Sequence, residues 1–257
     1  MELNKLRVKQ ILGWCETYRL ATDCKGIVLG ISGGKDSTVA AMLAKKVWGD
    51  DVYGVIMPNG QQSDIDDAIE VCTTLGIHYR VVNIEQVYNK LIKQTIYPEM
   101  NSTDEFFDKI SDKAKTNIAP RIRMTILYAI AQTLGYRVMG TGNRSERFIG
   151  WFTKWGDGAC DLNLLANLTC TEVIEVGLYL AEEFGLRETL IKKEPADGLT
   201  GKSDEDNFGF TYAELDKYVT NTSEFFIENE TTRKIVDMHK KTKHKLKMPY
   251  TVGDYDF

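Results

Sequence analysis

With 257 residues, 43% of them hydrophobic, the chain is long enough to bury one sizeable core, and we expect a single domain over residues 1–257. Its formal net charge of −5 argues against a general nucleic-acid binder, and no apolar run approaches the roughly 18 residues of a membrane-spanning helix. Because the N-terminus lacks the apolar stretch of a secretion signal and the five cysteines lack metal-site spacing, we expect reduced thiols in a cytoplasmic protein without a membrane partner.

The first half of the chain alternates between strand-like and helix-like segments. Apolar residues at helical spacing predict a helix over residues 3–20, and GIVLGIS (26–32) predicts a buried parallel strand. A helix over 37–48 follows, with Ser37 as its expected cap. Further along the chain we predict strands at 51–58, 78–84 and 136–142, and helices at 63–76 (capped by Ser63), 85–96 and 117–134.

This alternation is typical of an α/β fold with a doubly wound, mainly parallel sheet flanked by helices, which binds ligands beyond the carboxyl ends of its strands. The second half is less regular. We expect loops over 143–170 and helices at 171–185 and 211–219. The polar stretch 192–209 is predicted to be a long loop, either a functional lid or a disordered segment.

The stretch GISGGKDST, residues 30–38, follows the first predicted strand and opens a helix. Neither the Walker pattern nor the dinucleotide-binding fingerprint fits it, because Leu29, Asp36 and Ser32 stand where those patterns need glycine or a hydroxyl residue. A flexible strand-to-helix turn is one interpretation of so many glycines. The position between a buried strand and a helix favours a second interpretation, an anion site.

Backbone N–H groups of Gly33, Gly34 and the first helical turn, together with the helix dipole, are suited to hold a phosphate. The hydroxyls of Ser32 and Ser37 are further donors. Asp36 would repel an anion at this place unless a cation lay between them. The aspartate therefore predicts a divalent metal, Mg²⁺, shared between its carboxylate and phosphate oxygens.

The loop resembles the S-G-G-x-D-S pyrophosphate loop of the ATP pyrophosphatase superfamily, whose members split ATP between its α- and β-phosphates and transfer AMP to a substrate oxygen. The resemblance implies the Rossmann-like, adenine nucleotide alpha-hydrolase-like form of the predicted fold. It also implies an ATP site formed by Gly30, Ile31, Ser32, Gly33, Gly34, Lys35, Asp36 and Ser37.

Four further segments are similar, in the same order, to segments of ammonia-dependent NAD synthetases. They are MPNGQQSDIDDA (57–68), NIAPRIRMTILYAIA (117–131), MGTGNRSERFIGWFTKWGDGACDL (139–162) and KSDEDNFGFTYAELDKYV (202–219). On this basis the chain is identified as a member of the NAD synthetase family, of the short, ammonia-using type. The resemblance implies ATP- and Mg²⁺-dependent amidation of deamido-NAD (nicotinic acid adenine dinucleotide) by ammonia, giving NAD, AMP and pyrophosphate through an adenylated carboxylate.

The expected metal ligands are Asp36 and Glu146. Glu146 comes just past the fourth predicted strand, so its carboxylate is expected near Asp36. Two carboxylates from neighbouring strand ends can hold one Mg²⁺ on ATP oxygens, although a pair of solvated acids is the alternative. Thr141, at the same strand end, matches a threonine of the family's ATP site.

The sequence departs from the family at three positions of the expected ATP site. The family usually has lysine where this chain has Cys170, and a hydroxyl residue where it has Ala196. Lys35 stands where many members carry isoleucine or glutamine, and we expect it to compensate for the missing charge.

For deamido-NAD, the resemblance implies contacts with Arg121, Lys154 and Asp161, and Lys154 joins the carboxylates as a catalytic candidate. The pair His244-Lys245 matches the family's C-terminal substrate contact, with His239-Lys240 as a rival and a solvated basic helix end as the bland alternative. Three aromatic residues are candidates for stacking on the pyridine ring or for packing beneath a loop: Trp151, Phe152 and Trp155.

Two other functions remain open at this stage. A tRNA sulfur-transferase with the same loop would need paired cysteines and a basic surface, and a non-catalytic nucleotide-binding regulator is conceivable because of Cys170. The chain leaves no length for the amidohydrolase domain of glutamine-dependent enzymes, so we expect free ammonia as the nitrogen source unless a separate chain supplies it. The resemblance also implies a homodimer.

Overall fold

The computed structural model describes residues 2–96, 110–193, 203–220 and 229–249. Ala196 and the middle of the predicted lid, 194–202, lie outside the described residues. No helix within these described ranges is long and apolar enough to cross a membrane. All five cysteines are free thiols.

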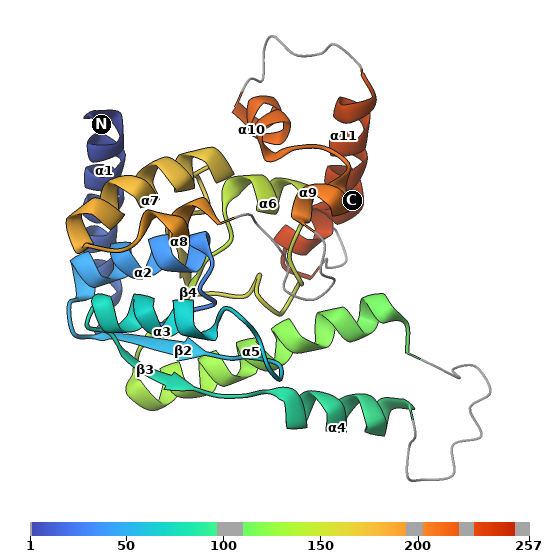
Figure 1. The fold of residues 1–257 in the computed structure, drawn as a ribbon, viewed down its shortest axis with the longest axis horizontal. Coiled ribbons are helices and arrows are strands. Elements are labelled where there is room, and N and C mark those ends of the chain that lie inside the picture. Colours follow the sequence, from blue (N-terminus) through green and yellow to red (C-terminus); the bar gives the residue numbers. More distant parts are fainter. Residues whose placement is uncertain (1, 97–109, 194–202, 221–228, 250–257) are drawn as a thin grey trace.

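Five parallel strands form the central sheet, in the order β3-β2-β1-β4-β5 (Figure 1). Pairing is in register from Ile27 opposite Val52 on one side of β1 and opposite Arg137 on the other. The chain therefore builds outward from β1 in one direction and then crosses to its other side with β4. The strands are β1 (Ile27–Gly30), β2 (Val52–Ile56), β3 (His78–Val81), β4 (Arg137–Gly140) and β5 (Leu162–Asn163).

Helices cover both faces of the sheet and extend beyond it. The helices are α1 (Glu2–Thr22), α2 (Lys35–Trp48), α3 (Ile65–Thr74), α4 (Glu85–Ile96), α5 (Asp112–Leu134), α6 (Arg144–Ile149), α7 (Cys170–Phe184), α8 (Glu188–Lys192), α9 (Asp204–Phe208), α10 (Tyr212–Thr220) and α11 (Glu230–Thr242), followed by the 3₁₀ turn η1 (Lys243–Leu246).

The main core lies between the sheet and one helical layer. In Figure 1, α1, α2, α3, α7 and α8 lie above the sheet, while α4 and α5 lie below it. The strand sequence IVLG of β1 is apolar on both faces, and Ile27 and Leu29 are fully buried under α2. Continuous apolar strands are what a sheet covered on both sides requires.

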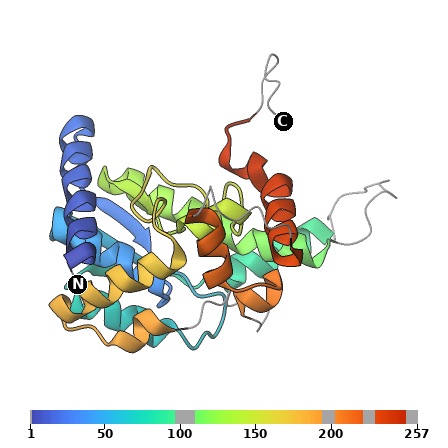
Figure 2. The same cartoon turned by 90° about the horizontal axis from the view of Figure 1, so that it is seen from above.

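A second, smaller apolar cluster joins α6, α9, α10 and α11 beside the sheet. It contains Ile149, Phe208, Leu215 and Ile235, and Ile174 of α7 packs against both this cluster and the main core. Figures 1 and 2 agree in placing α11 well apart from α1 along the long axis of the molecule. Part of the irregular second half, α6 and α9 to α11, thus forms a helical cluster beside the sheet.

The predicted α/β fold with a parallel, helix-flanked sheet is confirmed, with differences in local detail. Ser37 and Ser63 are not helix caps: α2 and α3 have Gly34 and Asp64 at these positions, without side-chain cap bonds. The expected loop over 143–170 contains α6 and β5, and the predicted lid contains α9. Short elements stabilised by distant packing leave little local pattern, which is why they were missed.

Candidate active site

The loop between β1 and α2 lies at the carboxyl end of the central strand. Because β1 pairs with β2 on one side and β4 on the other, this edge is the place where the strand order reverses. Gly33 has a φ of +77°, and a Cβ there would lie 2.6 Å from the carbonyl oxygen of Asp64. The loop therefore needs glycine at this position, and it packs directly against the start of α3.

Two serine hydroxyls tie the loop to the first turn of α2. Ser32 Oγ accepts from the Gly34 amide at 3.2 Å and lies 3.1 Å from Ser37 Oγ. Ser37 Oγ accepts from the Ser32 amide at 3.2 Å and donates to the Gly34 carbonyl at 3.0 Å. The Gly34 amide is thus engaged inside the loop. The first turn of α2 has no side-chain cap, and its amides and helix dipole suit an anion such as phosphate.

Asp36, in this first turn, is held by two neighbouring side chains. Its Oδ2 accepts from Lys35 Nζ at 2.8 Å, and its Oδ1 accepts from the side-chain amide of Asn143 at 3.0 Å. Lys35 is 4% exposed and Asn143 is fully buried, so both bonds form where little water competes. The negative charge inside the loop is therefore paired with a lysine of the same loop.

Glu146 is positioned by the start of α6. Asn143 is the N-cap of this helix. Its side-chain Oδ1 accepts from the Glu146 backbone amide at 3.0 Å, and its backbone amide donates to Glu146 Oε2 at 3.0 Å. This reciprocal capping box fixes Glu146 just past β4. Since the same Asn143 side chain also donates to Asp36, one residue holds both predicted metal ligands.

The electrostatics of this centre reflect two carboxylates and one buried cation. Burial raises the pKa of the Glu146 carboxyl well above its usual value, and the charge of Asp36 raises it further, whereas Lys35 acts in the opposite direction. Burial by itself lowers the pKa of Lys35, but the charges of Asp36 and Glu146 outweigh burial and raise it. The lysine therefore stays protonated.

The donor set fits a magnesium ion shared with a nucleotide. Within the described ranges, no three His, Cys, Asp or Glu side chains gather as a metal site, so a metal here would have the two carboxylates Asp36 and Glu146. Mg²⁺ prefers oxygen ligands and is commonly held by one or two carboxylates together with substrate phosphates and water. Each carboxylate oxygen also has lone pairs beyond those used by Lys35 and Asn143.

The other residues predicted to bind ATP have different surroundings. Gly30 ends β1 and Thr141 directly follows β4, so both lie at the carboxyl edge. Ile31 faces the core, with a side chain 1% exposed and an amide that donates to the Val55 carbonyl at 3.0 Å. Cys170 packs in the second apolar cluster, and burial raises the pKa of its thiol to about 12, so the thiol is neutral at pH 7.

Arg121 and Lys154 come together beside the helical cluster. Arg121 Nη2 donates to the Lys154 carbonyl at 3.4 Å. Lys154 Nζ donates to the His244 carbonyl at 2.7 Å and lies 5.3 Å from the ring centroid of Trp155. Trp155 is 47% exposed, with a φ of +61°. The ammonium of Lys154 and the exposed ring of Trp155 thus lie side by side, an arrangement suited to a negatively charged ligand that carries an aromatic ring.

The two candidate His–Lys pairs contact the end of α6 and the segment that follows it. Lys245 Nζ donates to the carbonyls of Gly150 at 2.7 Å and Phe152 at 2.8 Å, and burial lowers its pKa. His239 Nδ1 lies 2.7 Å from the Phe148 carbonyl, and the two rings stack with centroids 4.3 Å apart. α11 and η1 therefore contact the end of α6 and the segment after it through backbone carbonyl groups.

Asp161 and Trp151 have structural partners. Asp161 Oδ2 accepts from the Val138 amide at 2.8 Å, which continues the edge of β4, and its Oδ1 accepts from the Tyr128 hydroxyl at 3.4 Å. Trp151 meets Phe208 edge to face at 4.7 Å within the second apolar cluster. Of the aromatic candidates, Trp155 is the exposed one.

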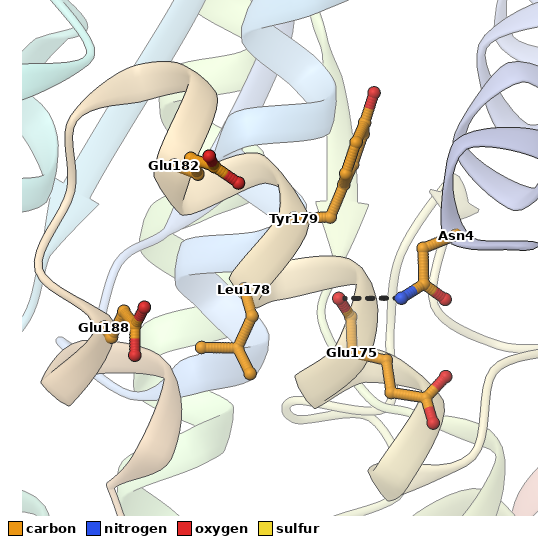
Figure 3. Close-up of a pocket in the computed structure, with 6 residues that line it drawn as sticks. All are labelled: Asn4, Glu175, Leu178, Tyr179, Glu182 and Glu188. Carbon is orange, nitrogen blue, oxygen red and sulfur yellow. Dashed lines mark hydrogen bonds between the residues drawn. The ribbon is translucent and has the colours of Figure 1, made fainter. Parts of the chain in front are cut away.

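A hollow of about 460 Å³ lies elsewhere, between α1, α7 and α8 (Figure 3). Glu175 is ion-paired with Arg7 and Glu188 with Lys192, so the charges of this hollow are largely neutralised. No residue of the phosphate loop lines it, and we do not place the chemistry there. The lining residues are Asn4, Glu175, Leu178, Tyr179, Glu182 and Glu188.

Sequence reasoning missed Asn143, Tyr212 and Asp204. An Asn followed three residues later by Glu is a capping-box signal, so Asn143 was detectable. Tyr212 lies under Lys35 and donates its hydroxyl to Asp204 Oδ2 at 2.9 Å. Both lie in the family-like segment 202–219, and the packing of α9 and α10 brings them to the site.

The fold and this site define a parallel α/β protein with a glycine-rich loop and two acidic residues at the point where the strand order reverses. A model of the NAD synthase family matches residues 7–249. The chain belongs to the NAD synthase family.

Individual relatives agree with this assignment. The chain is 38% identical over 249 residues to the NH3-dependent NAD+ synthetase of Carboxydothermus hydrogenoformans, covering 95% of each chain. Among solved structures, NMN synthetase from Francisella tularensis matches with a TM-score of 0.83 and 32% identity, over 96% of this chain and 98% of that one. An NH3-dependent NAD synthetase from Campylobacter jejuni, in complex with the nitrate ion, matches with a TM-score of 0.71 and 25% identity, over 96% of this chain and 98% of that one.

Proposed function

We propose that this chain catalyses the ATP-dependent amidation of deamido-NAD by ammonia, forming NAD, AMP and pyrophosphate. Membership of the NAD synthase family supports the overall reaction. The assignment to these residues depends on one observation: Asn143 hydrogen-bonds both Asp36, in the glycine loop's first helical turn, and Glu146, so the two carboxyl groups lie beside the loop. These groups lie at the carboxyl edge of the sheet, where such folds bind nucleotides.

In the first step, an oxygen of the nicotinate carboxylate attacks the α-phosphorus of ATP, and the bond to pyrophosphate breaks. The first-turn amides of α2 and the hydroxyl of Ser32 would stabilise the leaving pyrophosphate. Asp36 and Glu146 would hold Mg²⁺, which supplies positive charge to the phosphate oxygens when bound. The protein needs no covalent nucleophile, because alignment of the two substrates makes the reaction effectively unimolecular.

In the second step, ammonia attacks the activated carbonyl carbon and AMP leaves with the carboxylate oxygen. Arg121 and Lys154 would bind the anionic part of the dinucleotide, and the exposed ring of Trp155 would stack on its pyridine. Lys245 would hold the segment that carries Lys154 through its contacts with carbonyl groups there, and His239 would hold the end of α6 just before it.

A second candidate substrate is nicotinate mononucleotide. It is favoured by the TM-score of 0.83 with the Francisella tularensis NMN synthetase, against 0.71 for the Campylobacter jejuni NAD synthetase. The same chemistry would then form NMN. Parallel assays with deamido-NAD and nicotinate mononucleotide at equal concentration, compared by kcat/KM, decide between the two.

The test is incubation of the protein with ATP, Mg²⁺, ammonium and deamido-NAD, with AMP and NAD measured together. Equal amounts of AMP and NAD are expected. AMP formation that depends on tRNA would instead support a sulfur-transferase. Failure to form AMP with any acceptor would support a nucleotide-binding regulator. Asp36→Asn should abolish turnover, and a wild-type rate in that variant would remove the metal role of Asp36.

We also infer that residues 1–257 act as one catalytic unit and that two copies form a homodimer. Ile174 packs against both apolar clusters, which supports a single unit. Exposed apolar side chains on β3 and α4, at the sheet edge, support self-association: Tyr79, Val81, Val87 and Leu91. Light scattering coupled to size exclusion measures the mass, and a monomer at micromolar concentration would contradict the dimer.

A further inference from the structure

Lys35 is a lysine enclosed within the protein. Its side chain is 3% exposed, although lysine is among the residues least often buried without a partner. Its ammonium donates to Asp36 Oδ2 at 2.8 Å and lies 5.5 Å from the ring centroid of Tyr212. The Tyr212 hydroxyl donates to Asp204 Oδ2 at 2.9 Å, which fixes the ring beneath the ammonium. The ammonium of Lys35 is therefore held between one carboxylate and one aromatic face.

These contacts hold the positive charge of Lys35 where a metal ion is expected to bind. Asp36 and Glu146 are joined through Asn143, so two carboxyl groups share a site with little access to water. Two neighbouring carboxylates repel each other strongly in such surroundings unless a cation lies beside them. Lys35 is that cation in the structure described here.

The lysine side chain can also change partners. An ammonium has three N–H donors, of which one carboxylate oxygen uses one, and its four-carbon stem is flexible. Lys35 is the first residue of α2, directly after Gly34, so its stem starts at the edge of the phosphate cradle. Asp36 and the nucleotide's phosphates are thus both within the region that its ammonium can serve.

We propose that Lys35 is an exchangeable counter-ion of the ATP site. Without metal, its ammonium occupies Asp36 and keeps the two carboxylates together. When nucleotide and divalent metal bind, the ammonium releases Asp36 to the metal and donates to phosphate oxygens of the nucleotide. The proposal rests on the proposed function only in placing ATP at residues 30–38.

The exchange predicts opposite shifts in two binding constants. Lys35→Gln removes the competitor for Asp36, so Mn²⁺ alone should bind about tenfold more tightly, as followed by its free-ion EPR signal. The same variant loses a charged donor to phosphate, so ATP in EDTA should bind about tenfold more weakly by calorimetry; tenfold is the scale of one charge-assisted hydrogen bond. A merely structural lysine would weaken both or neither.

Matched variants complete the test. Lys35→Met has a similar stem without charge and should show the same two shifts, which covers the case in which the glutamine variant fails to fold. Lys35→Arg should keep ATP binding within about threefold of wild type, because the charge remains. Lys45→Gln, which removes an ion pair to Asp50 at the other end of α2, should change neither constant.

Unchanged or weaker Mn²⁺ binding in both uncharged variants would overturn the exchange. If the wild type forms AMP and NAD while the opposite shifts are missing, the counter-ion proposal is wrong and the function stands. If the shifts are present but the wild type forms no NAD, the proposal stands for an ATP site that serves another acceptor.

Discussion

Replacing Asn143 separates its two roles, capping α6 and holding Asp36. Loss of an N-cap costs about 1 kcal/mol, and loss of a hydrogen bond to a charged acceptor costs about 1.5–3 kcal/mol. Asn143→Ala removes both and should lower the free energy of unfolding by roughly 2–4 kcal/mol. Asn143→Ser keeps a cap for Glu146 but lacks the amide that donates to Asp36. The serine variant should therefore be about 1 kcal/mol more stable than the alanine variant.

The loss of kcat/KM should result from the lost contact with Asp36 rather than from the lost helix cap. Both variants should lose at least about tenfold in kcat/KM for ATP, because Asp36 is no longer fixed beside Glu146. Denaturant unfolding and initial rates of AMP formation measure the two effects. Asn229→Ala removes the equivalent capping box of α11 and should cost about 1 kcal/mol without changing the kinetics. A serine variant with wild-type kcat/KM would refute the holding role of Asn143.

Three further predictions concern the loop, the C-terminal segment and the core. Gly33→Ala should weaken ATP binding more than tenfold by calorimetry, because its Cβ would strike the Asp64 carbonyl. Lys245→Met should raise KM for deamido-NAD more than KM for ATP, since it frees the carbonyls of Gly150 and Phe152; equal changes would contradict this. Burial raises the pKa of the Cys72 thiol from 9.0 to about 12, so the unfolded chain loses this proton first and stability falls between those pH values. Cys72→Ala should reduce the slope of unfolding free energy against pH there by about 1.4 kcal/mol per pH unit, and an unchanged slope would refute the assignment.

The sequence was sufficient where the signal is local or motif-based. The apolar run at β1, the glycine loop and the strand–helix alternation predicted the sheet, and the positions of Asp36 and Glu146 after neighbouring strands predicted that their carboxyl groups lie close together. The partner of Asp36 was not predicted: the loop's negative charge implied a metal, and the structure adds Lys35 beside it. The orientation of the Lys35 side chain depends on the residues packed around it, here Tyr212 of α10.

Capping and packing details were the least predictable. Ser37 has the residue type of a cap, yet its hydroxyl bonds within the phosphate loop instead. Asp161, a predicted substrate contact, also accepts from the Val138 amide through its Oδ2 at 2.8 Å, which the sequence did not indicate. Both outcomes depend on a competing backbone group that tertiary structure brings close, and a single sequence carries no record of that competition.

In the proposed reaction, the loop at residues 30–38 directs a carboxylate oxygen of the substrate onto the α-phosphorus of ATP. The most direct measurement uses deamido-NAD labelled with ¹⁸O in the nicotinate carboxylate, followed by mass spectrometry of the nucleotide products. One ¹⁸O should appear in AMP, with unlabelled pyrophosphate, and Asp36→Asn should give neither product. Label in inorganic phosphate with ADP as the nucleotide product, or AMP free of label, would contradict the account.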